Sequence, residues 1–191
     1  MHFKLYKPYG YISQMYSNDE RQARKKRFLK DLYDFSEGVM PIGRLDEKSE
    51  GLLLLTTDGK LSNTINRSGI EKEYYVLVDG IITDEAIAEL RNGVLIGVNG
   101  EKYKTKAALV KRIDTPKLPD RKKKIRDARH GPTSWISITI TEGKFHQVRK
   151  MTSAVGFPTL RLVRVRVGEI HLDGIAPGIP VEISIPSLLF S

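Results

Sequence analysis

The chain has 191 residues and carries 32 Lys and Arg against 23 Asp and Glu, which gives a formal net charge of +9. A chain of this length can bury roughly 70% of its unfolded surface, so it needs no disulfides or structural metal to fold. The sequence contains no Cys, which excludes a disulfide scaffold, a thiol nucleophile and Cys-ligated zinc or iron–sulfur centres. The excess positive charge favours a polyanionic partner, and nucleic acid is the commonest such partner inside cells.

Neither a membrane span nor an export signal is apparent in the sequence. The longest uncharged stretch, residues 131–141, has 11 residues, whereas about 20 apolar residues are needed to cross a bilayer. The N-terminal segment carries Lys residues and lacks the apolar core of a signal peptide. We therefore expect a soluble cytoplasmic protein, folded as a single domain over residues 1–191, with a monomer as the default state.

Most of the positive charge is concentrated in three segments of the chain. Basic residues predominate in residues 21–30, 111–130 and 143–168, and the first and last of these contain no Asp or Glu. A single basic run usually marks a solvated face, but three runs in one small chain favour a surface that binds a polyanion. Such a surface supplies affinity and salt dependence, but it does not select a sequence.

Hydrophobic periodicity and turn residues predict a mixture of strands and helices. Strands are expected over residues 3–14 (with a bend at 7–10), 52–56, 74–78, 102–110, 136–140, 160–167 and 181–185. The strand over 136–140 is expected to be half-buried, because Ile alternates there with Ser and Thr. Helices are expected over residues 19–34, 60–65, 84–91 and 145–155, with Asp58 and Thr83 as N-caps of the second and third.

The connection between residues 115 and 132 contains three Pro and a basic run, which predicts a long loop. Strands outnumber helices and the two alternate irregularly along the chain. This order predicts an α+β fold with a largely antiparallel sheet.

Several common catalytic motifs are absent from the sequence. There is no Walker A loop, no G-x-G-x-x-G dinucleotide fingerprint and no G-x-S-x-G elbow. The four His residues lie far apart, without a ligand partner at short spacing, so we expect no dedicated metal site. Two classes remain, namely carboxylate chemistry and binding without chemistry.

The candidate carboxylate is Asp46, which lies between a turn flanked by Gly and the apolar run over residues 52–55. A rigid strand edge beside a basic surface would suit a carboxylate that acts as a nucleophile or a base. The alternative is a structural turn residue paired with Arg44. Composition alone favours this structural alternative.

The order of residues around Asp46 changes that balance. Residues 43–59 read GRLDEKSEGLLLLTTDG, and they closely resemble the G-R-L-D-x-x-[ST]-x-G-L-L-L-L-T-x-D-G signature of the ribosomal small- and large-subunit family of pseudouridine synthases. Further segments resemble motifs of that family in the same order, namely residues 7–10 (KPYG), 72–76 (KEYYV), 142–151 (EGKFHQVRKM) and 162–168 (LVRVRVG). The resemblance spans about residues 3–185. It is strongest to the large-subunit synthase E subgroup, which lacks the N-terminal RNA-binding module of most members, since KPYG already begins at residue 7.

The resemblance implies a fold and an activity. The fold would be the pseudouridine synthase fold, a mixed and largely antiparallel sheet with flanking helices and a central RNA-binding cleft. The activity would be the isomerisation of uridine to pseudouridine in ribosomal RNA, most specifically 23S (large-subunit) rRNA, without metal or cofactor. Asp46 would be the essential catalytic carboxylate. One carboxylate can suffice because no water has to be activated, unlike in a hydrolytic glycosidase.

The resemblance also assigns supporting residues to the reaction. Arg149 is expected to pair with Asp46, because a nearby guanidinium favours the ionised carboxylate. Tyr74 is expected to stack on the uracil, an interaction worth roughly 1–3 kcal/mol. Leu162 is expected to close the apolar wall of the pocket. For Tyr74 and Leu162 the alternative is ordinary core packing.

Binding of RNA would have to expose the target base. A uridine inside a helix must flip out of the stack to reach a pocket, which costs a few kcal/mol that phosphate contacts must offset. The loop over residues 117–129 is the candidate clamp on the RNA backbone, and a disordered basic tether is its alternative. The candidate RNA-binding residues are Arg44, Lys72, Arg121, Lys122, Lys123, Lys124 and Arg164.

Two other functions remain open at this point. The first is a catalytically inactive factor that binds ribosomal RNA or assists ribosome assembly on the same fold. The presence of Asp46, Tyr74 and Arg149 together favours an enzyme over such a factor. The second is a synthase that acts on small-subunit rRNA, since both branches of the family share these motifs.

Overall fold

A computed structural model describes residues 1–184, and Ile185, the last residue of the final predicted strand, lies outside the described residues. The chain packs as two compact units. Unit 1 comprises Met1–Ile70, Pro119–Lys123 and the chain from Val163 onward, and unit 2 comprises Glu71–Leu118 and Lys124–Leu162. The expectation of a single domain stays a prediction, and the two units are described separately below.

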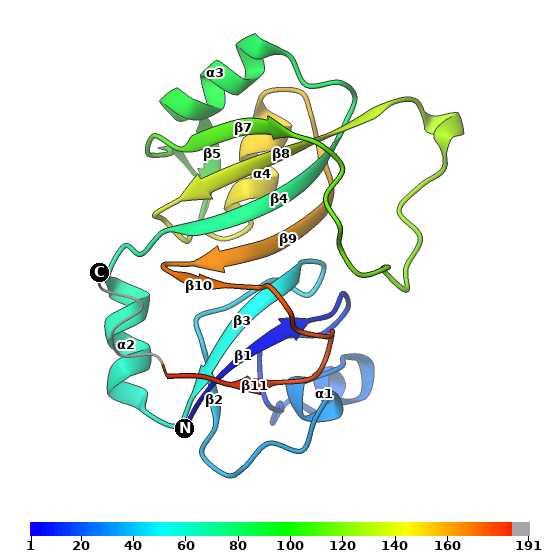
Figure 1. The fold of residues 1–191 in the computed structure, drawn as a ribbon. Helices are drawn as coiled ribbons and strands as arrows, with labels where there is room; N and C mark the ends of the chain where they lie inside the picture. Colours follow the sequence, from blue (N-terminus) through cyan, green and yellow to red (C-terminus); the bar gives the residue numbers. More distant parts are fainter. Residues whose placement is uncertain (185–191) are drawn as a thin grey trace. The chain divides into compact units, whose positions relative to one another are not determined.

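Unit 1 is built on a sheet whose strand order is β11-β1-β3-β9 (Figure 1). These strands are β1 (His2–Lys7), β3 (Glu50–Thr56), β9 (Thr159–Val167) and β11 (Val181–Glu182), joined at the sides by β2 (Met40–Ile42) and β10 (Ile170–His171). β1 and β3 are antiparallel, whereas β3 and β9 are parallel, so the sheet is mixed. Every residue of β3 is buried, as the predicted strand over 52–56 required.

The helices of unit 1 are short. α2 (Gly59–Arg67) begins at the predicted cap, where the Asp58 carboxylate accepts the backbone N–H groups of Lys60 and Leu61 at 2.9 and 3.1 Å. The long helix predicted over 19–34 is wrong. It divides into α1 (Glu20–Lys25) and a 3-10 turn (Leu29–Asp31), because α1 buries no residue that would extend it and the chain at Lys26 is extended.

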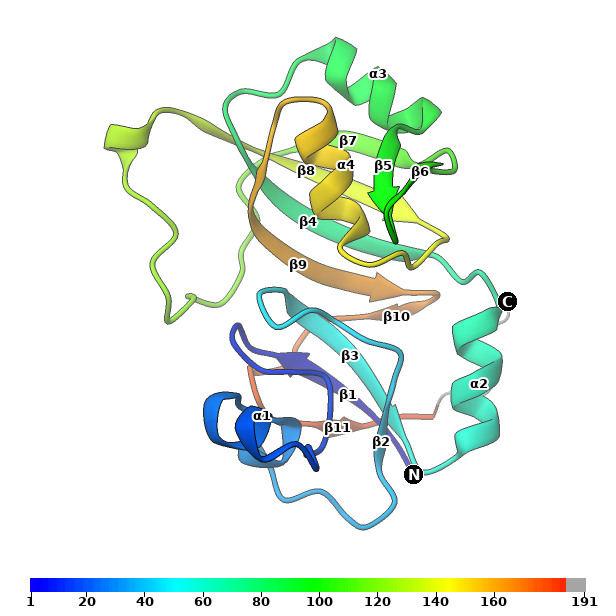
Figure 2. The same cartoon turned by 180° about the vertical axis from the view of Figure 1, so that it is seen from behind.

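Unit 2 contains an antiparallel sheet formed by β4 (Lys72–Asp79), β8 (Thr133–Ile140) and β7 (Leu109–Ile113). The first residues of β9 lie beside β4, and the N–H of Asp79 donates to the carbonyl of Pro158 at 2.9 Å. α4 (Gln147–Ala154) lies across one face of β4 and β8 (Figure 2). A separate hairpin joins β5 (Leu95–Val98) to β6 (Glu101–Lys104).

α3 (Asp84–Asn92) confirms the helix predicted after Thr83. The Thr83 hydroxyl accepts the N–H of Ala86 at 3.2 Å, and Ile87 and Leu90 face the core. The continuous strand predicted over 102–110 is wrong, because Thr105 turns back to the end of α3. Its N–H donates to the carbonyl of Val94, and its hydroxyl accepts the N–H of Val94, both at 2.9 Å.

Two other predicted strands also differ from the structure. The strand predicted over 3–14 ends at Lys7, where Pro8 and the following turn begin. β8 is buried on both faces rather than half-buried, and Ser137 and Thr139 are only 3% and 7% exposed. The Ser137 hydroxyl donates to the carboxylate of Glu73 at 2.7 Å, which satisfies this buried polar group.

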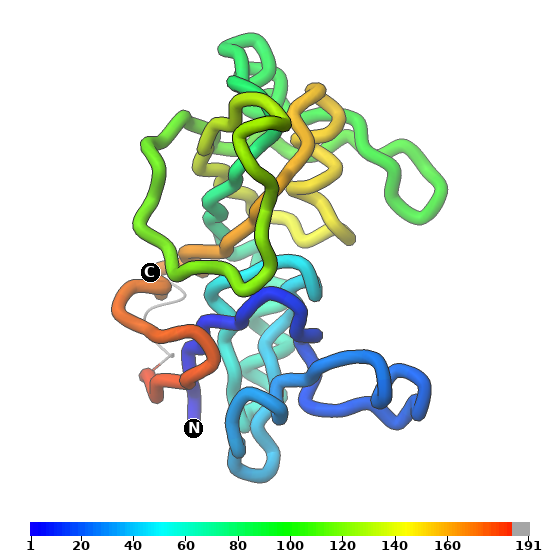
Figure 3. Tube along the Cα trace, turned by 90° about the vertical axis from the view of Figure 1, so that its right-hand side faces the viewer, coloured from blue at the N-terminus to red at the C-terminus, as the bar shows by residue number. Residues whose placement is uncertain are grey.

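The chain between β7 and β8 is a long loop, as predicted, with one 3-10 turn (Ala128–His130) near its end (Figure 3). Among the described residues, no helix is long and apolar enough to span a membrane.

Candidate active site

Asp46 lies in unit 1, on a tight turn between β2 and β3. The Ser13 hydroxyl donates to the carbonyl of Leu45 at 2.7 Å and accepts the N–H of the same residue at 3.0 Å. The N–H of Ser49 donates to the carbonyl of Asp46 at 3.0 Å. The buried Leu45 side chain adds an apolar anchor, so the backbone at Asp46 is fixed from both sides.

Arg164 secures the same turn from β9. Its Nε donates to the carbonyl of Leu52 at 2.7 Å, and its Nη1 lies 3.4 Å from the carbonyl of Arg44. The arginine is only 4% exposed. Arg164 therefore positions the backbone around Asp46, which differs from the RNA contact predicted for it, because a buried guanidinium bound to carbonyls offers little surface to a phosphate.

Gly51 allows β3 and β9 to approach each other at this point. Gly51 pairs with Arg164 in the parallel register and has φ +102°. A Cβ atom at Gly51 would lie 2.2 Å from the backbone oxygen of Arg164. No side chain fits in that space, so the Gly of the motif is a steric requirement.

A buried amine lies near the Asp46 carboxylate. The Nζ of Lys7 donates to the carbonyls of Pro8 and Tyr11 at 3.2 and 2.7 Å. Burial lowers the pKa of Lys7 to about 7, although the carboxylates of Asp46 and Glu50 act in the opposite direction. An amine with this pKa exchanges its proton near neutral pH, which changes the charge beside Asp46.

Two further carboxylates surround Lys7 in unit 1. Glu50 accepts the hydroxyl of Tyr6 at 3.3 Å, and Glu47 pairs with Lys26 at 2.6 Å. Sequence reasoning quoted Lys7 only as part of a motif and missed its burial. The available signal was a Lys at the end of an apolar strand, directly before Pro.

The other predicted catalytic residues belong to unit 2. Tyr74 is in β4 and Leu162 in β9, and they are 8% and 4% exposed. Arg149 lies in the first turn of α4, and Lys72 is the first residue of β4. Their predicted roles toward Asp46 and the substrate stay predictions.

The start of α4, which carries Arg149, is held by a buried carboxylate that sequence reasoning missed. Glu142 accepts the N–H of Lys106 at 2.8 Å, the side-chain amide of Gln147 at 2.9 Å and the hydroxyl of Tyr103. Burial acts to raise the pKa of Glu142, but the hydrogen bonds outweigh it and lower the pKa. Gln147 also accepts the N–H of Lys144 at 3.0 Å, which closes the turn before the helix.

The basic loop is attached to both units at defined points. The guanidinium of Arg121 lies 4.6 Å from the ring centroid of Tyr9, and the Nζ of Lys123 lies 5.7 Å from it, all within unit 1. Within unit 2, Arg126 forms an ion pair with Asp79. The remaining candidate cations of the RNA surface are exposed, namely Lys122, Lys124 and Arg44.

No group of three or more His, Asp or Glu side chains in residues 1–184 is arranged to hold a metal ion.

Three comparisons place this geometry among known proteins. The model of the family described as RNA pseudouridylate synthase matches residues 2–154. The chain is 42% identical to ribosomal large subunit pseudouridine synthase E of Xanthomonas axonopodis pv. citri (strain 306) over 176 residues, which cover 91% of this chain and 88% of that protein. It is 40% identical to the protein of the same name from Vibrio vulnificus (strain CMCP6) over 183 residues, or 95% and 74% of the two chains. Among solved structures, a crystal structure of pseudouridylate synthase has a TM-score of 0.74 and 28% identity, and the match covers 96% of this chain and 70% of that one.

Proposed function

The chain belongs to the RNA pseudouridylate synthase family, and we propose that it isomerises uridine to pseudouridine in ribosomal RNA of the large subunit. The observation that carries this proposal is the Asp46 turn, whose backbone is fixed by Ser13 and Arg164 within the region that the family model matches. The choice of large-subunit rRNA is supported by the names of the relatives that are about 40% identical to the chain.

The reaction rearranges bonds within one nucleotide. The bond between N1 of uracil and C1′ of the ribose breaks, the uracil turns, and C5 bonds to C1′. The proton of C5 is released and N1 takes up a proton, so no oxidant, reductant or water is consumed. The ionised carboxylate of Asp46 can add to the sugar, add to the base or accept a sugar proton, and each route needs it held still beside the glycosidic bond.

The supporting roles belong to the same proposal. Arg149 is the ion-pair partner of Asp46, Tyr74 stacks on the uracil, and Leu162 forms the apolar wall that keeps water from the detached base. Arg44 and Lys72 contact phosphates near the target, and residues 121–124 clamp the RNA backbone. We further propose that the enzyme is a cytoplasmic monomer without a cofactor, and its net charge of +9 supports an RNA partner.

Release of tritium from RNA labelled at C5 of uridine tests the proposal. The wild-type chain should release tritium from protein-free large-subunit rRNA without added cofactor. Asp46→Asn should reduce the rate roughly a thousandfold or more and leave RNA affinity nearly unchanged, because it removes charge but little volume. Asp173→Asn is the matched control, since Asp173 is an exposed aspartate of unit 1.

The failed outcome identifies the alternative. No release from large-subunit rRNA, small-subunit rRNA or partly assembled subunits, together with tight RNA binding, would contradict the proposed activity and favour an inactive assembly factor. Release from small-subunit rRNA alone would retain the activity and overturn the proposed substrate.

A further inference from the structure

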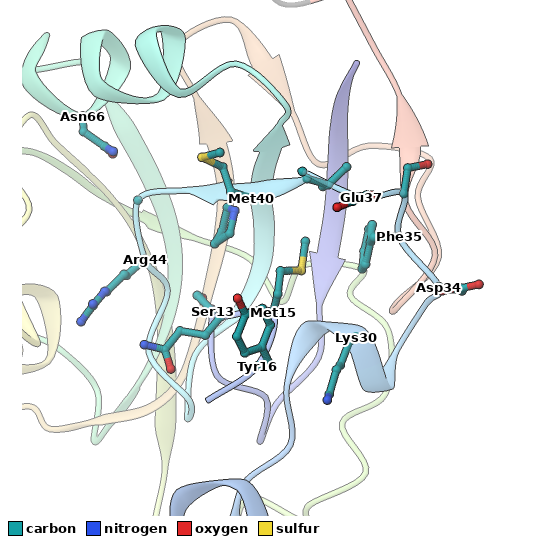
Figure 4. A pocket seen from close by; sticks show the side chains of 16 residues that line it. Ser13, Met15, Tyr16, Lys30, Asp34, Phe35, Glu37, Met40, Arg44 and Asn66 are labelled. Atoms are coloured by element: carbon teal, nitrogen blue, oxygen red, sulfur yellow. The ribbon is translucent and has the colours of Figure 1, made fainter. Parts of the chain in front are cut away.

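Unit 1 contains a pocket of about 940 Å³ that none of the proposed catalytic steps uses. Its walls come from the chain after β1, from the 3-10 turn and the segment that leads into β2, and from one residue of α2. Arg44 and Asn66 lie at one end, Asp34 and Glu37 lie toward the other, and Met15 and Met40 lie between them (Figure 4). A volume of this size is typical of a small-molecule site.

The end with Arg44 lies close to the candidate catalytic residue along the chain. Arg44 is exposed and precedes Asp46 by two residues, so their Cα atoms are at most about 7 Å apart. The neighbouring Gly43 has φ +68°, and a Cβ atom there would lie 2.9 Å from Oδ1 of Asn66. The glycine therefore admits the Asn66 amide to this end, beside an exposed guanidinium that suits a phosphate.

The middle of the pocket presents polarizable and aromatic side chains to solvent. Tyr16 is 62% exposed and Met40 is 37% exposed, and Met15 lines the same space. Exposed aromatic rings bind nucleobases by stacking, and Met adapts its shape to flat ligands.

The far end is rich in hydrogen-bond acceptors. Asp34 and Glu37 are exposed carboxylates that line it. Oε1 of Gln14, in the same lining, is a buried acceptor without a hydrogen-bond partner in the described part of the chain. With Lys30 and Arg44 as the only Lys or Arg of the lining, the charges sum to zero, so the pocket suits a ligand that combines one negative group with several donors.

We propose that this pocket binds a guanine nucleotide that neighbours the target uridine in the RNA. The phosphate meets Arg44, the base lies against Tyr16 and the two Met side chains, and the adjacent N1–H and N2–H₂ donors of guanine face the acceptors of the far end. Uracil fits this end poorly, because its two carbonyl oxygens flank a single N–H and would face carboxylates. The identity of the ligand as part of an RNA substrate rests on the proposed function, and the site would contribute to the choice of uridine.

Methyl NMR of the intact chain tests the site without any need for turnover. The chain has four Met residues, of which Met15 and Met40 line the pocket, whereas Met151 is buried in α4 of unit 2 and Met1 is the N-terminus. In protein labelled with methyl-¹³C methionine, guanosine 5′-monophosphate should shift the Met15 and Met40 signals. The Met1 and Met151 signals should stay in place. Uridine 5′-monophosphate and inorganic phosphate at the same concentration should shift the pocket signals at least about fivefold less.

Two variants separate the base contacts from general binding. Asp34→Asn combined with Glu37→Gln should abolish the preference for the guanine nucleotide over the uridine nucleotide. Tyr16→Ala should weaken binding of the guanine nucleotide about fivefold to tenfold, since a stacking contact is lost. Asp173→Asn, which lies outside the pocket, should change neither.

Turnover measurements connect the site to the RNA. With the labelled rRNA, Tyr16→Ala should raise KM about fivefold to tenfold with kcat little changed, because the residue binds a neighbour of the reacting nucleotide. Equal shifts by the guanine and uridine nucleotides, or no shift of Met15 and Met40, would overturn the proposal. Tritium release by a chain that binds no guanine nucleotide would remove the site alone, whereas guanine binding without release would support the site and contradict the proposed activity.

Discussion

The turn that carries Asp46 and the basic loop between β7 and β8 are both irregular segments, and they are held in opposite ways. Ser13 binds both backbone groups of Leu45, and the buried Arg164 binds the carbonyl of Leu52. The loop instead depends on exposed cations, with Arg121 against the ring of Tyr9 at 4.6 Å.

This difference separates positioning from binding. A carboxylate that acts on one bond needs a backbone fixed by buried hydrogen bonds, each of which costs roughly 1–3 kcal/mol to disrupt. Cations that follow a flexible RNA backbone need freedom to adapt, and their exposed contacts stabilise the fold by at most about 1 kcal/mol each. Substitutions in the two segments should therefore have different signatures, in stability for the turn and in salt dependence for the loop.

The largest expected effect on stability is at Gly51. Gly51→Ala places a Cβ atom 2.2 Å from the backbone oxygen of Arg164, at a φ of +102° that Ala rarely adopts. We expect the free energy of unfolding, measured with urea, to fall by about 3 kcal/mol or more. Gly59→Ala is the control, because nothing lies within 4 Å of a Cβ there and α2 tolerates Ala at its first residue. Equal stability of the two variants would contradict the rigid turn.

Next in size is the pH dependence produced by Lys7. Its pKa is about 7 in the folded chain and 10.5 for an ordinary lysine, because burial disfavours the charged amine. The unfolded chain therefore holds the proton more tightly, so the penalty is full below pH 7 and is relieved as the pH rises toward 10.5. Between pH 7 and 9 the unfolding free energy of the wild type should gain about 2 kcal/mol relative to Lys7→Met.

Denaturation of both proteins with urea at several pH values measures this difference. Comparison with the variant cancels most other titrating groups, since they are shared. Parallel stability profiles of the two proteins across this pH range would show that Lys7 keeps an ordinary proton affinity in the folded chain.

A smaller loss is expected at Ser13. Ser13→Ala leaves the N–H and the carbonyl of the buried Leu45 without their hydroxyl partner, which should cost about 2 kcal/mol. The rate of tritium release should fall more than RNA affinity, because the turn holds Asp46 but makes no predicted RNA contact. Ser153→Ala, at an exposed serine of α4, is the control for stability. A Ser13→Ala protein with full stability and full activity would show that other bonds fix the turn.

The sequence predicted those parts of the fold that local signals determine. The apolar run of β3 and the caps at Asp58 and Thr83 each act over a few residues, and the structure confirms them. The helix over 19–34 was wrong for the same reason, because helix-forming composition does not show that α1 buries no residue.

The site was less predictable, since its support comes from distant residues. Arg164 binds a carbonyl 112 residues away in the chain, and the motif it belongs to suggested a contact with RNA instead. Ser13 gave no signal, because a single Ser before a turn is common and its partner is 32 residues away. Family resemblance selected Asp46, but only long-range packing shows what holds it and which lysine lies buried beside it.

The basic loop should show the smallest effect on stability and a clear effect on RNA binding. Neutralising Arg121, Lys122, Lys123 and Lys124 together to Gln should change the unfolding free energy by about 1 kcal/mol or less, because only exposed ring contacts are lost. The logarithmic salt slope of RNA affinity should become shallower by roughly 2–3, at about 0.7 for each lost contact to a single-stranded phosphate. Four exposed cations elsewhere give a charge-matched control, namely Lys60, Arg67, Lys102 and Lys111. Equal changes of slope in both variants would assign the effect to net charge, whereas a larger change in the loop variant would identify the loop as the clamp.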